Sequence, residues 1–206
     1  MILYIDTSSR YLYSAIVDSN KVIEEIKEED DKNLSEVALP KIARMFEKSG
    51  LEPTDIKKII VVNGPGSFTG IRIGLTIAKV YAWSLNIPIT TIYSLEAMSL
   101  SGKKETNHVP MIDARRGFVY AAIYGNKNEE ILKPQHIKLE ELKEKLKNIK
   151  EYEIITNDEF DDFSDKTSYD PNILKIVEFF KDRKEINPHA VNPEYLKLTE
   201  AEESKK

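Results

Sequence analysis

Five short segments in the first half of the chain alternate apolar with polar residues or form short apolar runs, patterns typical of β-strands. They cover residues 1–7, 10–18, 21–29, 59–62 and 87–93. The second and third are joined at 18–21 by Asp-Ser-Asn-Lys, residues that favour a hairpin turn. The pattern therefore predicts an antiparallel hairpin near the N-terminus, followed by buried strands.

Helical spacing of apolar residues predicts two long helices between these strands, at 34–49 and 67–85. Gly50 is placed to end the first helix in a left-handed conformation. Pro40 lies inside it, and we expect it to kink or interrupt the helix. A shorter helix begins at Ser94, and the polar run GKKETN at 102–107 is typical of a linker.

The pattern then starts again after this linker. IDTSSRYLYSAIV at 5–17 matches IDARRGFVYAAIY at 112–124, because each has an Asp at a strand end and a Tyr seven residues beyond it. The elements expected after the second match follow the same order. They are a strand at 130–137, a helix at 139–146, a strand at 151–156 and a helix at 172–181. We interpret this as an internal structural duplication.

The predicted architecture is α/β, with helices packed on mixed sheets and two similar βββαβα halves. The N-terminal half is expected to cover 1–101 and the C-terminal half 108–198. The polar tail at 199–206 is expected to be disordered.

Composition narrows the possible functions. The 206 residues carry a formal net charge of −5, whereas a chain that binds nucleic acid by itself usually carries a basic excess. There is no cysteine, so thiolate chemistry is excluded, and the three histidines are far apart in sequence, a pattern that argues against a tight zinc site. No apolar run is long enough to cross a membrane, and the N-terminus lacks a signal-peptide pattern. We expect a cytoplasmic protein without membrane association.

The stretch VNGPGSFTGIRIG at 62–74 resembles a phosphate-binding turn between a strand and a helix. Its spacing departs from the Walker A, dinucleotide-binding and nucleophile-elbow motifs. Ser67 or Thr69 can cap the following helix, whose N-terminus could also hold an anion. Gly70 and Gly74 lie on one helical face and allow close packing, either with this chain's own core or with another subunit.

Asp6 and Asp113 each end a strand and open a turn, as do the phosphate- and metal-binding aspartates of actin-like phosphotransferases. Neither turn has the glycine that lets backbone N–H groups close on phosphate. An active nucleotide site is therefore disfavoured, and turn capping is the favoured role of both carboxylates. Arg115 and Arg116 are interpreted as a solvated pair, with phosphate or an acidic partner as the alternative.

Five stretches together resemble the bacterial TsaB (YeaZ) family. They are GPGSFTGIRIG, AKVYAW, SLEAM, IDARRGFVYAA and VNPEYLK, in this order along nearly the whole chain. The signature loop consists of Gly64, Pro65, Gly66, Ser67, Phe68, Thr69 and Gly70. The resemblance implies the actin-like, sugar-kinase-like fold (ASKHA, ribonuclease H-like) with two similar halves.

The resemblance also implies a role in tRNA modification without catalysis by this chain. Family members pair with the paralogous catalytic subunit TsaD, which transfers threonylcarbamoyl to the adenosine beside the tRNA anticodon, and the ATPase TsaE joins them. No catalytic, cofactor or metal residue is expected here, because nucleotide and metal belong to TsaD. Contact with tRNA is expected only through the complex, and a homodimer when the chain is alone.

The implied partner interface is formed by the first two helices. Its candidate residues are Leu34, Val37, Ala38, Ile42, Met45, Gly70, Ile73, Gly74, Ile77 and Tyr81. On this hypothesis Gly74→Arg disrupts association more than folding, whereas unfolding would mean that the glycine face is core. Two alternatives stay open from the residues alone: a stand-alone actin-fold ATPase or kinase, and a peptidase.

Overall fold

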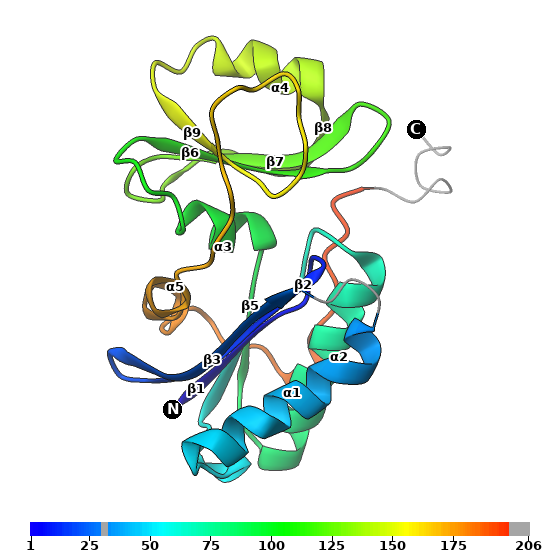
Figure 1. The fold of residues 1–206 in the computed structure, drawn as a ribbon, viewed down its shortest axis with the longest axis vertical. Helices are drawn as coiled ribbons and strands as arrows, with labels where there is room; N and C mark the ends of the chain where they lie inside the picture. The colour runs from blue at the N-terminus through cyan, green and yellow to red at the C-terminus, as the bar shows by residue number, and fades with distance from the viewer. Residues whose placement is uncertain (30–32, 198–206) are drawn as a thin grey trace. The chain divides into compact units, whose positions relative to one another are not determined.

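The computed structural model describes residues 1–29 and 33–197. The predicted disordered tail at 199–206 lies outside this range. The described chain divides into two compact units. The first comprises Met1–Ser94 and Pro171–Glu194, and the second begins at Leu95 and continues to Asp170, with the chain from Tyr195 onward grouped with it. Each unit contains one five-stranded sheet (Figure 1).

The sheet of the first unit has the order β3-β2-β1-β4-β5. Its strands are β1 (Ile2–Asp6), β2 (Tyr11–Asp18), β3 (Lys21–Glu29), β4 (Lys58–Val62) and β5 (Ile89–Ile92). The first three are antiparallel, whereas β4 and β5 run parallel to β1. All five strands were predicted within a few residues, and the hairpin between β2 and β3 is confirmed.

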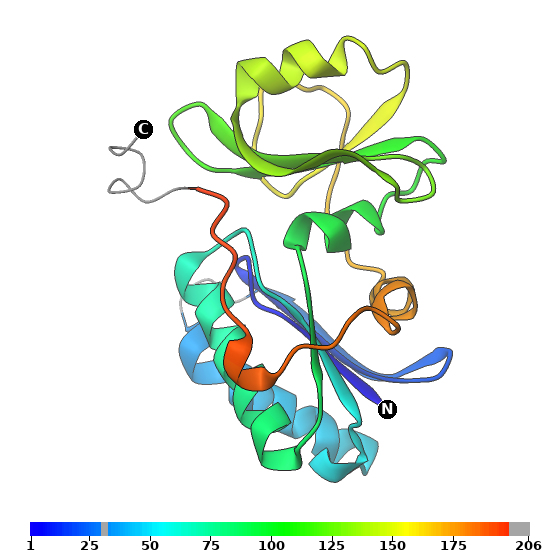
Figure 2. The ribbon, with the colours of Figure 1, turned by 180° about the vertical axis from the view of Figure 1, so that it is seen from behind.

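Helices cover both faces of this sheet. α1 (Leu34–Ser49) and α2 (Phe68–Leu85) lie on one face, and α5 (Ile173–Phe180) lies on the other (Figures 1 and 2). Two short 3₁₀ turns, Pro53–Asp55 and Pro188–Ala190, complete the unit. The core between the sheet and the helix pair is mainly aliphatic, and Leu3, Ile5, Ala38, Ile42 and Ala78 in it are fully buried.

α1 continues through Pro40 without a break, so the predicted interruption is wrong. Proline removes one backbone donor, but residues on both sides of it, Ala38 and Ile42, are fully buried against the sheet. Packing on both sides of Pro40 offsets the one lost hydrogen bond. Gly50 ends the helix with φ of 67°, as predicted, and its N–H bonds to the carbonyl of Glu47.

The second unit repeats the strand order of the first, because β8-β7-β6-β9-β10 corresponds to β3-β2-β1-β4-β5. Its elements are α3 (Ser94–Ser99), β6 (Asn107–Asp113), β7 (Phe118–Tyr124), β8 (Glu130–Lys138), α4 (Leu139–Leu146), β9 (Tyr152–Ile155) and β10 (Lys166–Thr167). β7 and β8 are antiparallel partners, and β9 runs parallel to β6. The duplication is therefore confirmed at the level of sheet topology.

The two halves differ after their fourth strand. In the first unit β4 leads into α2, whereas β9 leads into a loop and the two-residue strand β10. The helix α5, which follows, packs on β1, β2 and β3 of the first sheet. The structure thus groups residues 171–194 with the first unit, whereas the sequence pattern placed the whole of 108–198 in the C-terminal half. The chain returns to the first unit because α5 is apolar: Ile173, Ile176 and Val177 are almost completely buried there.

No helix within the described residues is long and apolar enough to span a bilayer.

A buried carboxylate in the second unit fixes the predicted linker. Glu153 is 2% exposed, and its Oε2 accepts hydrogen bonds of 2.9 Å from the backbone N–H groups of Lys103 and Lys104. Its Oε1 accepts one of 2.6 Å from the Thr167 hydroxyl, and the His108 ring nitrogen lies 3.7 Å from Oε2. Burial by itself raises the pKa of Glu153, but these hydrogen bonds outweigh it and lower the pKa on balance.

We expect Glu153→Gln to destabilise the second unit at pH 7 by about 1–3 kcal/mol, because an amide cannot accept all these bonds. Because folding lowers the pKa of Glu153, its carboxylate stabilises the folded state at pH values above the pKa of the unfolded chain. This stabilisation is lost as the pH falls through the lower pKa of the folded state. The gap between the native chain and the variant should therefore shrink below about pH 4. Chemical denaturation at pH 7 and pH 3.5 checks this, and an equal gap at both values would contradict it.

Candidate functional site

The signature loop connects β4 to α2 at the carboxyl edge of the first sheet. Its serine caps the helix, because Ser67 Oγ accepts a hydrogen bond of 3.2 Å from the Gly70 N–H. Of the two predicted caps, Ser67 is therefore confirmed. Ser94 holds the loop from the other side: its Oγ donates to the Pro65 carbonyl at 2.6 Å, and its N–H donates to the Gly64 carbonyl at 2.8 Å.

The glycines of this loop bring its backbone against the turn that follows β1. Ser67 N–H donates to the Ser8 carbonyl at 2.7 Å. A Cβ on Gly66 would lie 2.2 Å from that same carbonyl oxygen, and one on Gly70 would lie 2.1 Å from the Thr7 carbonyl oxygen. Real Cβ atoms do not approach so closely. These glycines therefore serve packing between two backbone segments of this chain.

The same turn uses the first candidate aspartate internally. Asp6 is 2% exposed, and its Oδ1 accepts hydrogen bonds from the Ser8 N–H at 2.8 Å and the Ser8 hydroxyl at 2.7 Å. In the second unit, Asp113 Oδ1 likewise accepts from the N–H two residues on, that of Arg115, at 2.8 Å. Both carboxylates cap the turns that follow them, as the sequence indicated.

Arg115 and Arg116 follow Asp113 on an exposed turn, and both adopt left-handed backbone angles, with φ of 64° and 55°. Within residues 1–29 and 33–197, no group of three or more His, Cys, Asp or Glu side chains could hold a metal ion. The sequence offered the turn after Asp6, the turn after Asp113 and the signature loop as candidate sites. In the structure, the polar groups of all three form hydrogen bonds within the chain.

The structure divides the ten candidate interface residues between core and surface. Ala38, Ile42, Met45 and Ile77 belong to the core of the first unit, and Leu34 is at its edge. Gly70 and Gly74 are buried against the Thr7 segment. Partial exposure remains at Val37, Ile73 and Tyr81. Tyr81 stacks on Phe46 with ring centroids 6.2 Å apart, which ties α2 to α1.

The same two helices expose four other apolar side chains, which we call the α1/α2 apolar group. They are Leu39 (49% exposed), Phe68 (56%), Val80 (57%) and Trp83 (67%). Trp83 lies one helical turn from Val80 on α2, and with Thr76 these residues form one outward stripe. Arg72 covers the Phe68 ring, with its guanidinium carbon 3.8 Å from the centroid.

The sequence did not single out this group as an interface. α2 is apolar nearly all round, so periodicity alone does not separate its inward and outward faces. The useful signal was the combination of the two glycines with a tryptophan on the same helix. Glycines that require close packing mark the inward face, and the opposite face then contains Trp83.

The contact of Gly74 with Thr7 makes a testable prediction. A Cβ on Gly74 would lie 2.3 Å from Thr7 Oγ1, whose hydroxyl donates to the Gly70 carbonyl at 2.7 Å. Its next neighbours, Ile5 Cγ2 at 3.5 Å and Thr7 Cβ at 3.6 Å, allow ordinary contact. We expect Gly74→Ala to cost about 1–3 kcal/mol in the native chain. In a Thr7→Ala background the same change should be neutral or stabilising by up to about 1 kcal/mol, because alanine favours helix.

A thermodynamic cycle of the two single variants and the double variant measures this coupling by urea unfolding. A cost of Gly74→Ala that is the same in both backgrounds would contradict the contact. For Gly74→Arg, the burial of this position now makes loss of stability the expected result.

Comparison with known proteins agrees with this architecture. The family model described as "TsaD: tRNA N6-adenosine threonylcarbamoyltransferase" matches residues 21–177. The chain is 34% identical over 221 residues to the tRNA threonylcarbamoyladenosine biosynthesis protein TsaB of Bacillus subtilis, an alignment that covers 98% of this chain and 96% of the relative. It is also 34% identical over 118 residues to TsaB of Escherichia coli, covering 50% and 51% of the two chains.

The structure of YeaZ from Pseudomonas aeruginosa superposes with a TM-score of 0.72 at 19% identity, covering 95% of this chain and 99% of that one. This likeness shows that the fold is shared. The match to the Bacillus subtilis protein extends over almost the full length of both sequences. The chain therefore belongs to the TsaB (YeaZ) family.

Proposed function

We propose that this chain is a non-catalytic subunit in the biosynthesis of threonylcarbamoyladenosine in tRNA, and that it binds and activates the paralogous catalytic subunit TsaD. The names of its relatives support the pathway, since TsaB of Bacillus subtilis and of Escherichia coli are both called biosynthesis proteins for this nucleoside. The name of the matching family model supports the paralogy with the transferase.

The observation that carries the partner role is the α1/α2 apolar group. A tryptophan that is 67% exposed, with an exposed valine one turn away, is typical of a surface that another protein covers. The inner faces of α1 and α2 pack on their own sheet, so the outer faces are left for a partner. TsaD, which has the same kind of helix pair according to the family resemblance, fits as that partner through a bundle of helices.

The absence of catalysis by this chain is supported by what its candidate groups do. The Asp6 carboxylate is bonded to Ser8, and the glycines of the signature loop pack on Thr7 and Ser8. A nucleotide or metal would accordingly sit on TsaD. On the same proposal TsaE joins the assembly, tRNA is reached only through the complex, and the isolated chain forms a homodimer through the α1/α2 apolar group.

Gel filtration of the purified chain with TsaD from the same organism tests this proposal. We expect co-elution of the two proteins, and in a strain depleted of its own TsaB we expect the chain to restore threonylcarbamoyladenosine, measured by mass spectrometry of digested tRNA. Failure to co-elute under all conditions, with and without ATP, TsaE and tRNA, would overturn the partner role. Calorimetry of the isolated chain with ATP and Mg²⁺ tests the stand-alone ATPase in parallel.

A further inference from the structure

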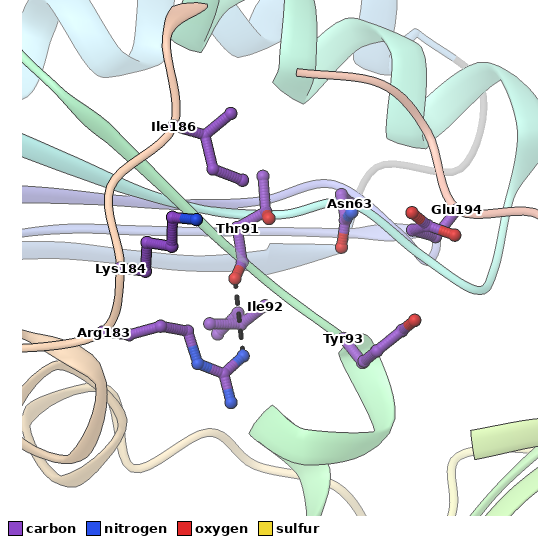
Figure 3. A pocket seen from close by; sticks show the side chains of 8 residues that line it. All are labelled: Asn63, Thr91, Ile92, Tyr93, Arg183, Lys184, Ile186 and Glu194. Carbon is purple, nitrogen blue, oxygen red and sulfur yellow. Dashed lines mark hydrogen bonds between the residues drawn. The ribbon is translucent and has the colours of Figure 1, made fainter. Parts of the chain in front are cut away.

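A cavity of about 270 Å³ opens on the first unit beside the edge strand β5 (Figure 3). Its lining comes from the residue after β4, from the end of β5 and from the returning segment that follows α5. The residues are Asn63, Thr91, Ile92, Tyr93, Arg183, Lys184, Ile186 and Glu194. None of these belongs to the α1/α2 apolar group, so the cavity is a separate feature of this unit.

The cavity lies where parallel α/β sheets commonly bind ligands, at the carboxyl ends of neighbouring parallel strands. Asn63 directly follows β4 and Tyr93 directly follows β5. The returning segment forms the opposite wall and is fixed at both ends. Ile186 N–H donates to the Ile89 carbonyl at 2.7 Å, and the Glu194 N–H donates to the Asn63 carbonyl at 2.8 Å.

The guanidinium of Arg183 lies on this wall and is held in position. Its central carbon is 4.2 Å from the centroid of the Phe180 ring, and its Nη1 donates a hydrogen bond to the Thr91 carbonyl at 3.5 Å. The backbone is held as well, because the Thr90 hydroxyl donates to the Arg183 carbonyl at 3.4 Å. Figure 3 shows Lys184, the next residue, at the same side of the cavity. This side therefore carries two positive charges, one of which is already oriented by packing.

Neutral polar groups lie between this cationic side and Glu194. Asn63 is only 7% exposed, and its Nδ2 donates to the Asn192 carbonyl over a long 3.5 Å. Its Oδ1 has no partner within residues 1–29 and 33–197. The Thr91 carbonyl faces away from β4, since it accepts the hydrogen bond from Arg183 and the carbonyl of the next residue, Ile92, accepts from the Asn63 N–H. A nearly buried amide and a strand-edge peptide group thus face the same space.

The charges around the cavity select the ligand. Arg183 and Lys184 attract an oxyanion, whereas Glu194 repels a second negative charge. A guanidinium matches the planar geometry of a carboxylate. The volume of about 270 Å³ lies just below the roughly 300–1,000 Å³ typical of drug-sized sites, so the cavity suits a small ligand. We propose that this cavity binds a small organic monocarboxylate that carries a hydroxyl or amino group. Arg183 and Lys184 hold its carboxylate, and Asn63 and Thr91 bond the polar substituent.

Titration of the ¹⁵N-labelled full chain with L-lactate, propionate, inorganic phosphate and AMP tests this proposal by amide chemical shifts. We expect saturable shifts of Thr91, Tyr93 and Asn63 with L-lactate, weaker binding of propionate, which lacks the hydroxyl, and still weaker binding of phosphate and AMP. The isolated chain suffices, so the result is independent of TsaD and of the proposed function. No saturable shift with either carboxylate would overturn the proposal, and so would tighter binding of phosphate or AMP.

Single substitutions test the roles of the charged residues that line the cavity. Lys184→Gln, at an exposed position, should raise the Kd for L-lactate about tenfold, the effect of one charge-assisted hydrogen bond. Lys175→Gln, an exposed lysine on α5, is the matched control and should leave the Kd unchanged. Glu194→Gln should strengthen phosphate binding relative to L-lactate. Equal effects of the two lysine variants would contradict the assigned cationic side.

Discussion

Gly66→Ala is expected to destabilise the first unit by about 3 kcal/mol or more. Two causes act together. Gly66 has φ of 151°, a conformation that residues with a side chain rarely adopt. The added Cβ would also lie 2.2 Å from the Ser8 carbonyl oxygen, an atom of the backbone that cannot rotate away. The midpoint of urea unfolding, followed by circular dichroism, measures the loss.

Gly117→Ala separates the two causes. Gly117 also has a positive φ, of 76°, but apart from its own residue and its two chain neighbours, no atom of the described chain lies within 4 Å of the position of its Cβ. We expect it to cost only about 1–2 kcal/mol, the conformational part alone. A Gly66→Ala cost no larger than that of Gly117→Ala would mean that the loop moves away from Ser8 easily, and that the close approach is unimportant for stability.

The topology of this fold was largely predictable from local pattern. The strand at 21–29, the helices at 34–49 and 67–85, and the helix at 139–146 have alternation or periodicity strong enough to fix their boundaries. The duplication was visible because the hairpin after Asp6 and the hairpin after Asp113 keep the same spacing. Local chemistry and long-range packing agree in these elements.

Long-range contacts were harder to predict. Nothing local in 172–181 indicates whether this helix packs on the second sheet or returns to the first. Pro40 is tolerated because Ala38 and Ile42, two positions before and after it, are fully buried where α1 packs on the sheet. The cavity beside β5 depends on Arg183 meeting Thr91, a contact across 92 residues. Each of these features results from tertiary packing, which periodicity does not report.

The candidate site was predicted in part. Capping by Ser67 and turn capping by Asp6 follow from residue types at element ends, and the structure has both. The choice between core and interface for α2 needed coordinates, because both faces of this helix are apolar. Once Gly70 and Gly74 are placed against Thr7, the outward stripe with Val80 and Trp83 is the face of α2 that remains exposed.

Trp83→Ala is expected to weaken association with TsaD by about 2–4 kcal/mol, or roughly 30- to 1,000-fold in Kd, while folding stability stays within about 0.5 kcal/mol of the native chain. Large aromatic side chains in the centre of an interface commonly dominate its binding energy, and this one is 67% exposed in the isolated chain. It therefore contributes little to the fold and much apolar area to a partner. Calorimetric titration of TsaD with the native and variant chains measures the change.

Phe179→Ala is the matched control, since Phe179 is an aromatic residue that is 51% exposed on α5, on the opposite face of the same sheet. It should leave the affinity for TsaD unchanged. Val80→Ala, one turn from Trp83, should weaken binding by a smaller amount, because it removes less apolar area. Equal effects of Trp83→Ala and Phe179→Ala would place the partner elsewhere. Loss of stability in Trp83→Ala would instead show that this side chain belongs to the chain's own core, and the α1/α2 apolar group would no longer support the partner role.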